Sequence, residues 1–242
     1  MYTPDQLTKI VFFDLETAPG FESLDKLEDR NPKMAELWSK RCEYLRSKFE
    51  ENRDKTDELL YLEKAALHAE FNRIVCASFG RITFQNDQPN MIVKSYCSSD
   101  ESEVIEGLTK VFNNFSKLKF CGHNIKRFDV PVACKRIIIN GHELPKGLQI
   151  SELKPWEMPF IDTSEVWSFG AWQEGFTSLE LFATCLGIDT PKDDIRGEQV
   201  GEVFWQGDLD RISNYCEKDV FATGQILLKL SGLDLMSDYQ QQ

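Results

Sequence analysis

The stretch that most constrains this chain is residues 10–17, I-V-F-F-D-L-E-T, because it sets two carboxylates in an otherwise apolar run. Such a run predicts a buried β-strand, which we expect over residues 9–15. Side chains two apart on a strand lie on one face, roughly 6 to 7 Å apart, so Asp14 and Glu16 point together. Unpaired carboxylates are costly in a core. Either the strand ends at the surface with two solvated acids, or a hard cation such as Mg²⁺ or Mn²⁺ lies between them.

Two further acids belong to helical segments. In residues 120–131, F-C-G-H-N-I-K-R-F-D-V-P, an apolar strand is followed by Asp129 at the start of a helix expected over residues 129–140. An Asp there is either an ordinary N-cap or a functional acid. In residues 212–220, I-S-N-Y-C-E-K-D-V, Tyr215 and Asp219 are four apart on a helix expected over residues 209–231. They therefore share a face, and its apolar neighbours predict that this face points inward.

The rest of the chain alternates strands and helices, which predicts an α/β sheet with one antiparallel hairpin. Residues 22–70 differ, because they are charged and carry apolar residues at helical spacing, which predicts two amphipathic helices inserted after the first strand. We interpret residues 1–242 as a single domain carrying this insertion. The expected strands are 73–80 and 91–96 with a turn at 86–90, then 118–122 and 160–162; the other expected helices are 101–115 and 177–186; the apolar positions of the insertion are Trp38, Cys42, Leu45, Phe49, Leu59, Leu62 and Ala66.

These stretches together resemble the three motifs of the DEDD exonuclease superfamily, which has a ribonuclease-H-like fold. The motifs are D-L-E on the first strand, N-x-x-x-F-D before a helix, and Y-x-x-x-D on a late helix. The tyrosine at position 215 resembles the DEDDy type. R-I-V-C-A-S-F-G at 73–80 and S-L-E-L-F-A-T-C-L-G-I at 178–188 are similar to the proofreading exonuclease domain of B-family DNA polymerases, in a stand-alone form with a helical insertion.

The resemblance implies a fold, a cofactor and a set of site residues. The fold would be a ribonuclease-H-like mixed sheet flanked by helices. Asp14, Glu16, Asp129 and Asp219 match the carboxylates that hold two divalent ions, Mg²⁺ or Mn²⁺, and Tyr215 would orient or help deprotonate the attacking water. The residues expected near the terminal nucleotides are Thr17, Asn124, Phe128 and Lys192.

Several neighbours of the motifs have two interpretations. Lys126, Arg127, Lys135 and Arg136 form either a phosphate contact or a solvated helix face. For His123 we favour a structural hydrogen bond over a general base. Asp162 has no motif and stays outside the metal set, and Trp172 and Phe176 suggest a mobile loop near the strand exit.

Composition limits the class of function. The formal net charge is −12 and the sequence pI about 4.8, so the chain is not a general polyanion binder, and positive charge at a nucleic acid would have to come from metal ions or a small basic patch. The seven cysteines lack a C-x-x-C spacing, which argues against a disulfide framework or a zinc site. We saw no signal peptide and no apolar run of membrane length, and we expect a cytoplasmic protein with no membrane contact.

The sequence therefore predicts a metal-dependent 3′–5′ exonuclease acting on single-stranded DNA ends. A 3′–5′ exoribonuclease or oligoribonuclease is the first alternative, because no residue indicates recognition of a ribose 2′-hydroxyl. A catalytically silent nucleic-acid-binding module is the second. The expected partner is a single-stranded 3′ end, DNA in preference to RNA, and a separate polymerase or repair protein is a candidate protein partner.

Overall fold

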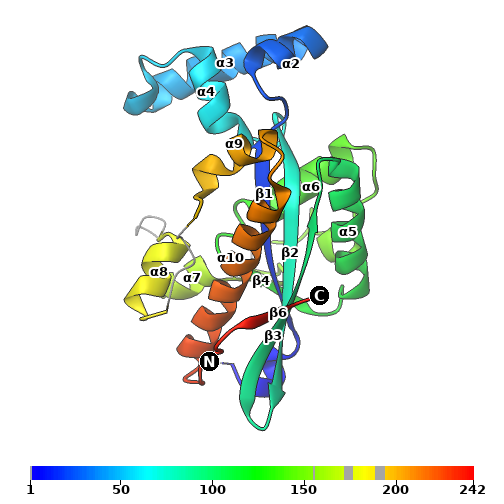
Figure 1. The fold of residues 1–242 in the computed structure, drawn as a ribbon, viewed down its shortest axis with the longest axis vertical. Helices are drawn as coiled ribbons and strands as arrows, with labels where there is room; N and C mark the ends of the chain where they lie inside the picture. Colours follow the sequence, from blue (N-terminus) through cyan, green and yellow to red (C-terminus); the bar gives the residue numbers. More distant parts are fainter. Residues whose placement is uncertain (1, 155, 172–176, 189–193) are drawn as a thin grey trace.

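The computed structural model describes residues 2–154, 156–171, 177–188 and 194–242 (Figure 1). These residues form a six-stranded sheet in the order β5-β4-β1-β2-β3-β6. Strand β2 runs antiparallel to β1 and β3, whereas β4 is parallel to β1, β5 to β4 and β6 to β3. Helices cover the sheet, so the expected α/β class, a mixed sheet flanked by helices, is confirmed.

The elements follow the order strand, inserted helices, hairpin, then alternating helices and strands. Within the described residues, no helix is both long and apolar enough to cross a membrane. The strands are β1 (Ile10–Pro19), β2 (Asn72–Gln85), β3 (Gln88–Cys97), β4 (Lys119–Gly122), β5 (Phe160–Asp162) and β6 (Tyr239–Gln241); the helices are α1 (Pro4–Leu7), α2 (Leu24–Arg30), α3 (Pro32–Lys48), α4 (Asp57–Lys64), α5 (Glu101–Asn114), α6 (Asp129–Ile139), α7 (Thr163–Ser168), α8 (Leu179–Cys185), α9 (Val200–Trp205) and α10 (Leu209–Leu230), with 3₁₀ turns η1 (Glu50–Asn52), η2 (Ala65–Leu67), η3 (Lys146–Leu148) and η4 (Gly197–Gln199).

Two strand predictions need correction. The first strand does not end at residue 15, because β2 continues to pair with it as far as Pro19, opposite Asn72. The hairpin turn is also shorter than residues 86–90. Only Asn86 and Asp87 form it, with φ angles of 51° and 62°, as a two-residue turn with positive φ at both positions requires. Strand β6 was not expected, since three residues carry too little pattern to identify a strand.

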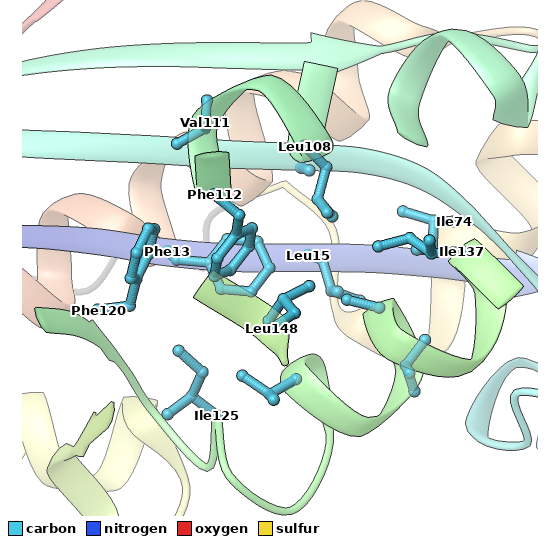
Figure 2. Close-up of a cluster of buried hydrophobic side chains, with 14 of the residues drawn as sticks. Phe13, Leu15, Ile74, Leu108, Val111, Phe112, Phe120, Ile125, Ile137 and Leu148 are labelled. Atoms are coloured by element: carbon cyan, nitrogen blue, oxygen red, sulfur yellow. The ribbon is translucent and has the colours of Figure 1, made fainter. Parts of the chain in front are cut away.

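Alternate side chains of β1 enter two separate cores. Phe13 and Leu15 face α5 and α6, in the larger core drawn in Figure 2. There the Phe13 and Phe112 rings meet edge to face at 5.3 Å between centroids, and Phe112 stacks on Phe120 at 4.2 Å. Phe12 faces the opposite way and packs with residues of α10. The sheet is therefore covered on one face by α5 and α6 and on the other by α10.

The helices between β1 and β2 pack around a small core of their own, beyond the end of the sheet (Figure 1). Trp38 is its centre, and its ring lies 4.9 Å from that of Phe71. The predicted face of α4 is wrong, because Leu59 and Leu62 are exposed whereas Leu60 and Tyr61 are buried. In an eight-residue helix, the sequence pattern is compatible with more than one buried apolar face. Packing against α3 determines which face is buried.

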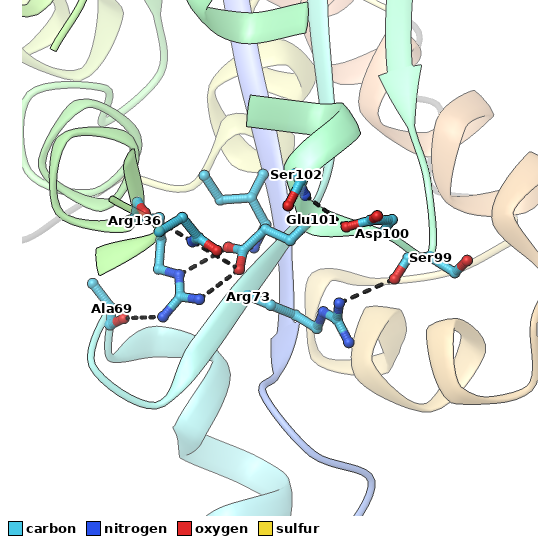
Figure 3. A network of polar contacts seen from close by, with 9 residues as sticks. Ala69, Arg73, Ser99, Asp100, Glu101, Ser102 and Arg136 are labelled. Carbon is cyan, nitrogen blue, oxygen red and sulfur yellow. Dashed lines mark hydrogen bonds and ion pairs between the residues drawn. The ribbon is translucent and has the colours of Figure 1, made fainter. Parts of the chain in front are cut away.

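A buried ion pair links α5 to α6, and its arginine also contacts the end of the insertion (Figure 3). The Glu101 carboxylate on α5 accepts hydrogen bonds from the guanidinium of Arg136 on α6 and from the Ile74 main-chain N–H on β2. Arg136 also donates to the Ala69 carbonyl, where the insertion returns to the sheet, at 3.1 Å. Arg136 is therefore a buried structural residue, and its predicted place in a surface basic cluster is wrong.

Candidate active site

Asp14 and Glu16 lie within β1, on the face that α10 covers. Their partners on β2 are Ser78 and Cys76, and the pairing shifts by one residue directly after Glu16. This irregularity follows the second acid, so the two carboxylates keep the regular two-residue spacing and share a face. Glu16 is buried and Asp14 is half-buried. The strand therefore carries both acids at mid-length, not at a solvated end.

The sheet opens beside these acids. Strand β4 pairs with β1 only over residues 10–12 and then turns away. Gly122 permits the close approach at this point, since a Cβ there would lie 2.7 Å from the Phe13 carbonyl oxygen. Beyond it, the Leu15 N–H has no strand partner on that side and instead donates to Asp129 Oδ1 at 3.2 Å. The free edge of β1 thus brings the third acid to the first two.

Asp129 is not the N-cap of α6, which removes the ordinary interpretation of this acid. The N-cap position is Phe128, and it makes no side-chain cap hydrogen bond. Asp129 is the first helical residue and is buried. Its carboxylate accepts a hydrogen bond from the main chain of β1 and faces the other acids. Its position at a helix N-terminus favours the charged form of the carboxylate.

Tyr215 and Asp219 reach the site from α10, which packs directly against β2. Gly80 of β2 allows this approach, because a Cβ at that position would be 2.7 Å from Val220 Cγ1. Both functional side chains are buried, and the Tyr215 hydroxyl is hydrogen-bonded to Asp219. The inward direction expected from the i, i+4 spacing is therefore what the helix adopts.

The four carboxylates act on one another electrostatically. Burial first, and then the nearby Cys216, Asp129, Glu16 and Asp219, raise the pKa of Asp14 well above its usual value. Burial first, and then Cys216, Asp219 and Asp129, raise the pKa of Glu16 well above its usual value. Burial is also the largest cause that raises the pKa of Asp129 to about 7, with Asp219 among the charges that add to it. The cluster is short of positive charge.

Tyr215 is held in the same field. Burial is the main cause that raises the pKa of its hydroxyl, and Asp219, Glu16 and Asp14 add to it. The phenol therefore stays protonated at neutral pH, and it can donate or accept a hydrogen bond without acting as a base.

The carboxylate oxygens of this cluster suit hard divalent cations. Ligand atoms of Asp14, Glu16 and Cys216 lie within 4.8 Å of one another. Two carboxylates at that separation, with Asp129 and Asp219 close enough to raise their pKa, are the oxygen donors that Mg²⁺ and Mn²⁺ prefer. The residues therefore fit the expected metals.

The residues expected to hold substrate are differently placed. The Thr17 hydroxyl donates to the Ala66 carbonyl at 2.8 Å, so its side chain ties β1 to the insertion and only its backbone is available. Asn124 has a φ of 60°, and its N–H donates to Asp162 at 2.9 Å. Phe128 is partly exposed and rests against the larger core. Lys192, like Trp172 and Phe176, lies outside the described residues.

His123 and Asp162 organise the loop that leads to Asp129. The ring nitrogens of His123 lie 2.9 Å from Thr163 Oγ1 and 2.8 Å from the Thr177 carbonyl oxygen, which supports the structural interpretation of this histidine. Asp162 is buried and accepts hydrogen bonds from the N–H groups of Asn124, Lys126 and Ser164. Its carboxylate is used by the backbone, which supports leaving it outside the metal set.

The expected basic cluster does not form a continuous patch. Lys126 pairs with Glu165 at 2.6 Å and Lys135 with Glu70 at 3.3 Å, both partly or largely exposed. Of these four residues, only Arg127 is exposed and has no ion pair with any described residue. Sequence clustering was misleading because it cannot show the acids that a fold places opposite.

A groove of about 870 Å³ lies between the insertion and α9, and none of the five proposed site residues lines it. Pro19, three residues beyond Glu16 on β1, is one of its lining residues. More acids than bases line it, which disfavours a phosphate backbone along its length. The charged lining residues are Glu22, Glu63, Glu198, Glu202, Lys55 and Lys64.

Cys216 was missed as a neighbour of the acids. Its Sγ lies 3.4 Å from Asp14 Oδ2. The sequence held one signal, because Cys216 directly follows Tyr215 on the helix, but a cysteine in an apolar context is usually a core residue.

Comparison with known proteins gives two similarities. A family model described as "Predicted 3'-5' exonuclease related to the exonuclease domain of PolB" matches residues 65–240, more than half of the chain. The family B DNA polymerase of the hyperthermophilic archaeon Pyrobaculum calidifontis is similar in structure, with a TM-score of 0.49 and 16% sequence identity over 92% of this chain and 24% of the polymerase. The chain spans about a quarter of that polymerase's length. No curated protein sequence matches significantly.

Asp129, Tyr215 and Asp219 fall within the matched range, whereas Asp14, Glu16 and nearly all of the insertion precede it. The assignment of the first two acids therefore rests on their position beside the other three residues.

Proposed function

Because the chain belongs to the family of predicted 3′–5′ exonucleases related to the PolB exonuclease domain, we propose that it is a metal-dependent 3′–5′ exonuclease acting on single-stranded DNA. Its site residues would be Asp14, Glu16, Asp129, Tyr215 and Asp219. A DNA end would be hydrolysed one nucleotide at a time from the 3′ terminus.

One observation carries this proposal, namely the convergence of four carboxylates from β1, α6 and α10 in a single, mostly buried cluster. The cluster is costly without cations, so a folded chain that keeps it indicates a cation-dependent role. Bound Mg²⁺ or Mn²⁺, two ions per site, would supply an activated water and neutralise charge at the phosphate.

Tyr215 would orient that water. Because its hydroxyl stays protonated, it suits positioning by hydrogen bond and not proton removal. The rigid attachment of the acids to β1 and α10 keeps the geometry that catalysis requires.

Substrate choice rests on the surroundings of the cluster. The acidic groove and the net charge of −12 disfavour a long duplex and favour a few terminal nucleotides. Phe128 and Asn124, beside Asp129, would contact the last nucleotides, with Thr17 contributing its backbone and Lys192 a phosphate contact. RNA is the alternative substrate.

The cellular setting is also part of the proposal. All seven cysteines are free thiols, which suits a reducing compartment such as the cytoplasm. A separate polymerase or repair protein would supply the ends to be degraded.

The test is a gel assay with matched 5′-labelled single-stranded DNA and RNA, in Mg²⁺, in Mn²⁺ and in chelator. We expect a metal-dependent ladder that shortens from the 3′ end, with DNA preferred, and no ladder for Asp14→Ala. A ladder on RNA alone would favour the exoribonuclease, and intact strands in both metals would favour a silent binding module.

A further inference from the structure

Cys216 faces the acids and not the hydrophobic interior alone. It follows Tyr215 on α10 and is completely buried. Its Sγ lies 3.4 Å from Asp14 Oδ2 and 3.5 Å from the Asp14 carbonyl oxygen. The Sγ atom and one carboxylate oxygen each of Asp14 and Glu16 lie within 4.8 Å of one another. One soft donor atom, the sulfur, and two hard donor atoms, the oxygens, therefore lie close enough to bind a single metal ion.

Glu16 gives an independent indication that this point binds an ion. Glu16 as a whole residue is only 9% exposed. No described residue donates a hydrogen bond to its carboxylate, and burial, followed by Cys216 and the neighbouring acids, is the main cause that raises its pKa. A buried carboxylate normally has a hydrogen-bond partner or a cation. The groups next to the Glu16 carboxylate are themselves possible metal ligands. A cation is therefore the partner that this carboxylate lacks.

The spacing of the donors suits zinc. With bonds of about 2.3 Å to sulfur and 2.0 Å to oxygen, a tetrahedral ion sets these two donors about 3.5 Å apart. The Cys216 thiol donates a hydrogen bond to Asp14 Oδ2 at 3.4 Å, so replacing the proton by the ion would change this spacing little. Thiolate selects Zn²⁺ and similar soft ions, whereas Mg²⁺ and Mn²⁺ prefer the oxygens alone.

We propose that Asp14, Glu16 and Cys216 form a three-ligand site for Zn²⁺, which displaces the catalytic cations and inhibits the enzyme. On binding, the thiol releases its proton to solvent and the sulfur bonds to the ion, with no change of oxidation state. The inhibition rests on the proposed function, whereas the binding does not. The spacing of cysteines in the sequence could not reveal this site, because it has one cysteine and two acids from distant segments.

The binding is tested without any nuclease assay. Cd²⁺, which is also thiophilic, is titrated into the metal-free protein while the ultraviolet charge-transfer absorbance of a metal–thiolate bond is followed. We expect one equivalent to give the band in the wild type. The matched control is Cys42→Ser, which changes another fully buried helical cysteine and should keep the band.

Cys216→Ser should lose the band and bind Zn²⁺ at least about tenfold more weakly. Cys216→Ala serves if the serine variant fails to fold, and circular dichroism checks both. Asp14→Asn should also weaken binding. A band of full amplitude in both Cys216 variants would overturn the site.

The inhibition is tested with Mn²⁺-supported DNA cleavage in rising Zn²⁺. We expect Cys216→Ser to need at least about tenfold more Zn²⁺ for half-inhibition than the wild type. Equal inhibition of the two would overturn the displacement even where the band is lost. A wild type that binds Cd²⁺ but cleaves nothing would overturn the proposed function and leave the metal site standing.

Discussion

At the scale of single residues, the site is a cluster of like charges assembled at a cost to stability. Asp14, Glu16 and Asp129 all have raised pKa values, and burial is the first cause for each. Folding therefore favours their protonated forms, and the charged forms are disfavoured until cations arrive. The opposite would hold for acids placed to strengthen the fold.

The first prediction concerns Asp129 and pH. Its folded pKa of about 7 lies above the ordinary 3.8, so the folded state binds more protons between these values. In chelator, stability should therefore be fully present below about pH 4 and fall as the pH rises to about 7. Asp129→Asn keeps an acceptor for Leu15 N–H and removes the charge. We expect it to raise the free energy of unfolding at pH 8 by about 1 to 3 kcal/mol, measured in urea.

A lower stability of the Asn variant at both pH 4 and pH 8 would instead make Asp129 a structural acid. Measuring at both values separates loss of the hydrogen bond from relief of charge.

The second prediction concerns Tyr215. Tyr215→Phe should lower kcat roughly 100-fold, because the water loses its positioning hydroxyl. Mn²⁺ affinity, followed by calorimetry, should stay within about twofold, since the phenol is not a ligand. Full activity in the Phe variant would remove the hydroxyl from the reaction.

At the scale of elements, the site depends on how closely α10 approaches the sheet. Gly80 and Gly224 sit at this contact, and a Cβ at Gly224 would lie 2.4 Å from Met91 Cε. The helix carries Asp219 only one residue from Val220, which packs over Gly80. A small displacement of α10 therefore moves a proposed metal ligand.

The third prediction tests this approach with Gly80→Ala. The added methyl group overpacks against Val220 and should cost about 1 to 3 kcal/mol of stability. We also expect weaker Mn²⁺ binding, because α10 shifts. Gly197→Ala is the stability control, since the nearest atom to its Cβ would be the Tyr215 hydroxyl, 3.9 Å away. Equal melting temperatures for the two variants would argue against a tight contact.

The fourth prediction concerns the ion pair in Figure 3. Arg136→Met leaves the Glu101 carboxylate buried without its main partner and should cost about 3 to 5 kcal/mol in urea unfolding. The adjacent Lys135→Met removes only an exposed pair with Glu70 and should change stability by less than about 1 kcal/mol. Similar losses for both would mean that burial of Arg136 contributes little.

At the scale of the whole molecule, the negative net charge and the acidic site both disfavour binding of nucleic acid in the absence of metal ions. The net charge of −12 gives no general attraction for nucleic acid. Cations bound at the four carboxylates would then have two effects. They would neutralise the charge of the cluster, and they would attract a phosphate of the substrate. Stability and substrate binding should both depend on metal.

The fifth prediction follows from that linkage. Mn²⁺ at 100 times its dissociation constant should raise the free energy of unfolding by about 2.7 kcal/mol. Asp14→Ala should lose this gain while being as stable as the wild type, or more stable, in chelator. Thermal melting with and without Mn²⁺ measures both effects. An alanine variant that is much less stable in chelator would make Asp14 a structural residue.

The sequence by itself determined the kinds of element and the positions of the acids on them. A two-residue spacing on a strand and a four-residue spacing on a helix fix which side chains share a face, and both are local properties of the backbone. Asp14 with Glu16, and Tyr215 with Asp219, were therefore predictable. The alternation of strands and helices similarly predicted the α/β class.

The tertiary structure alone decided which of these faces meet. Residues far away in the chain determine four of these features: the length of β1, the burial of Arg136, the inward face of α4 and the place of Cys216 beside Asp14. Local periodicity contains no information on such contacts, because pairing and packing energies arise only when distant segments are brought together.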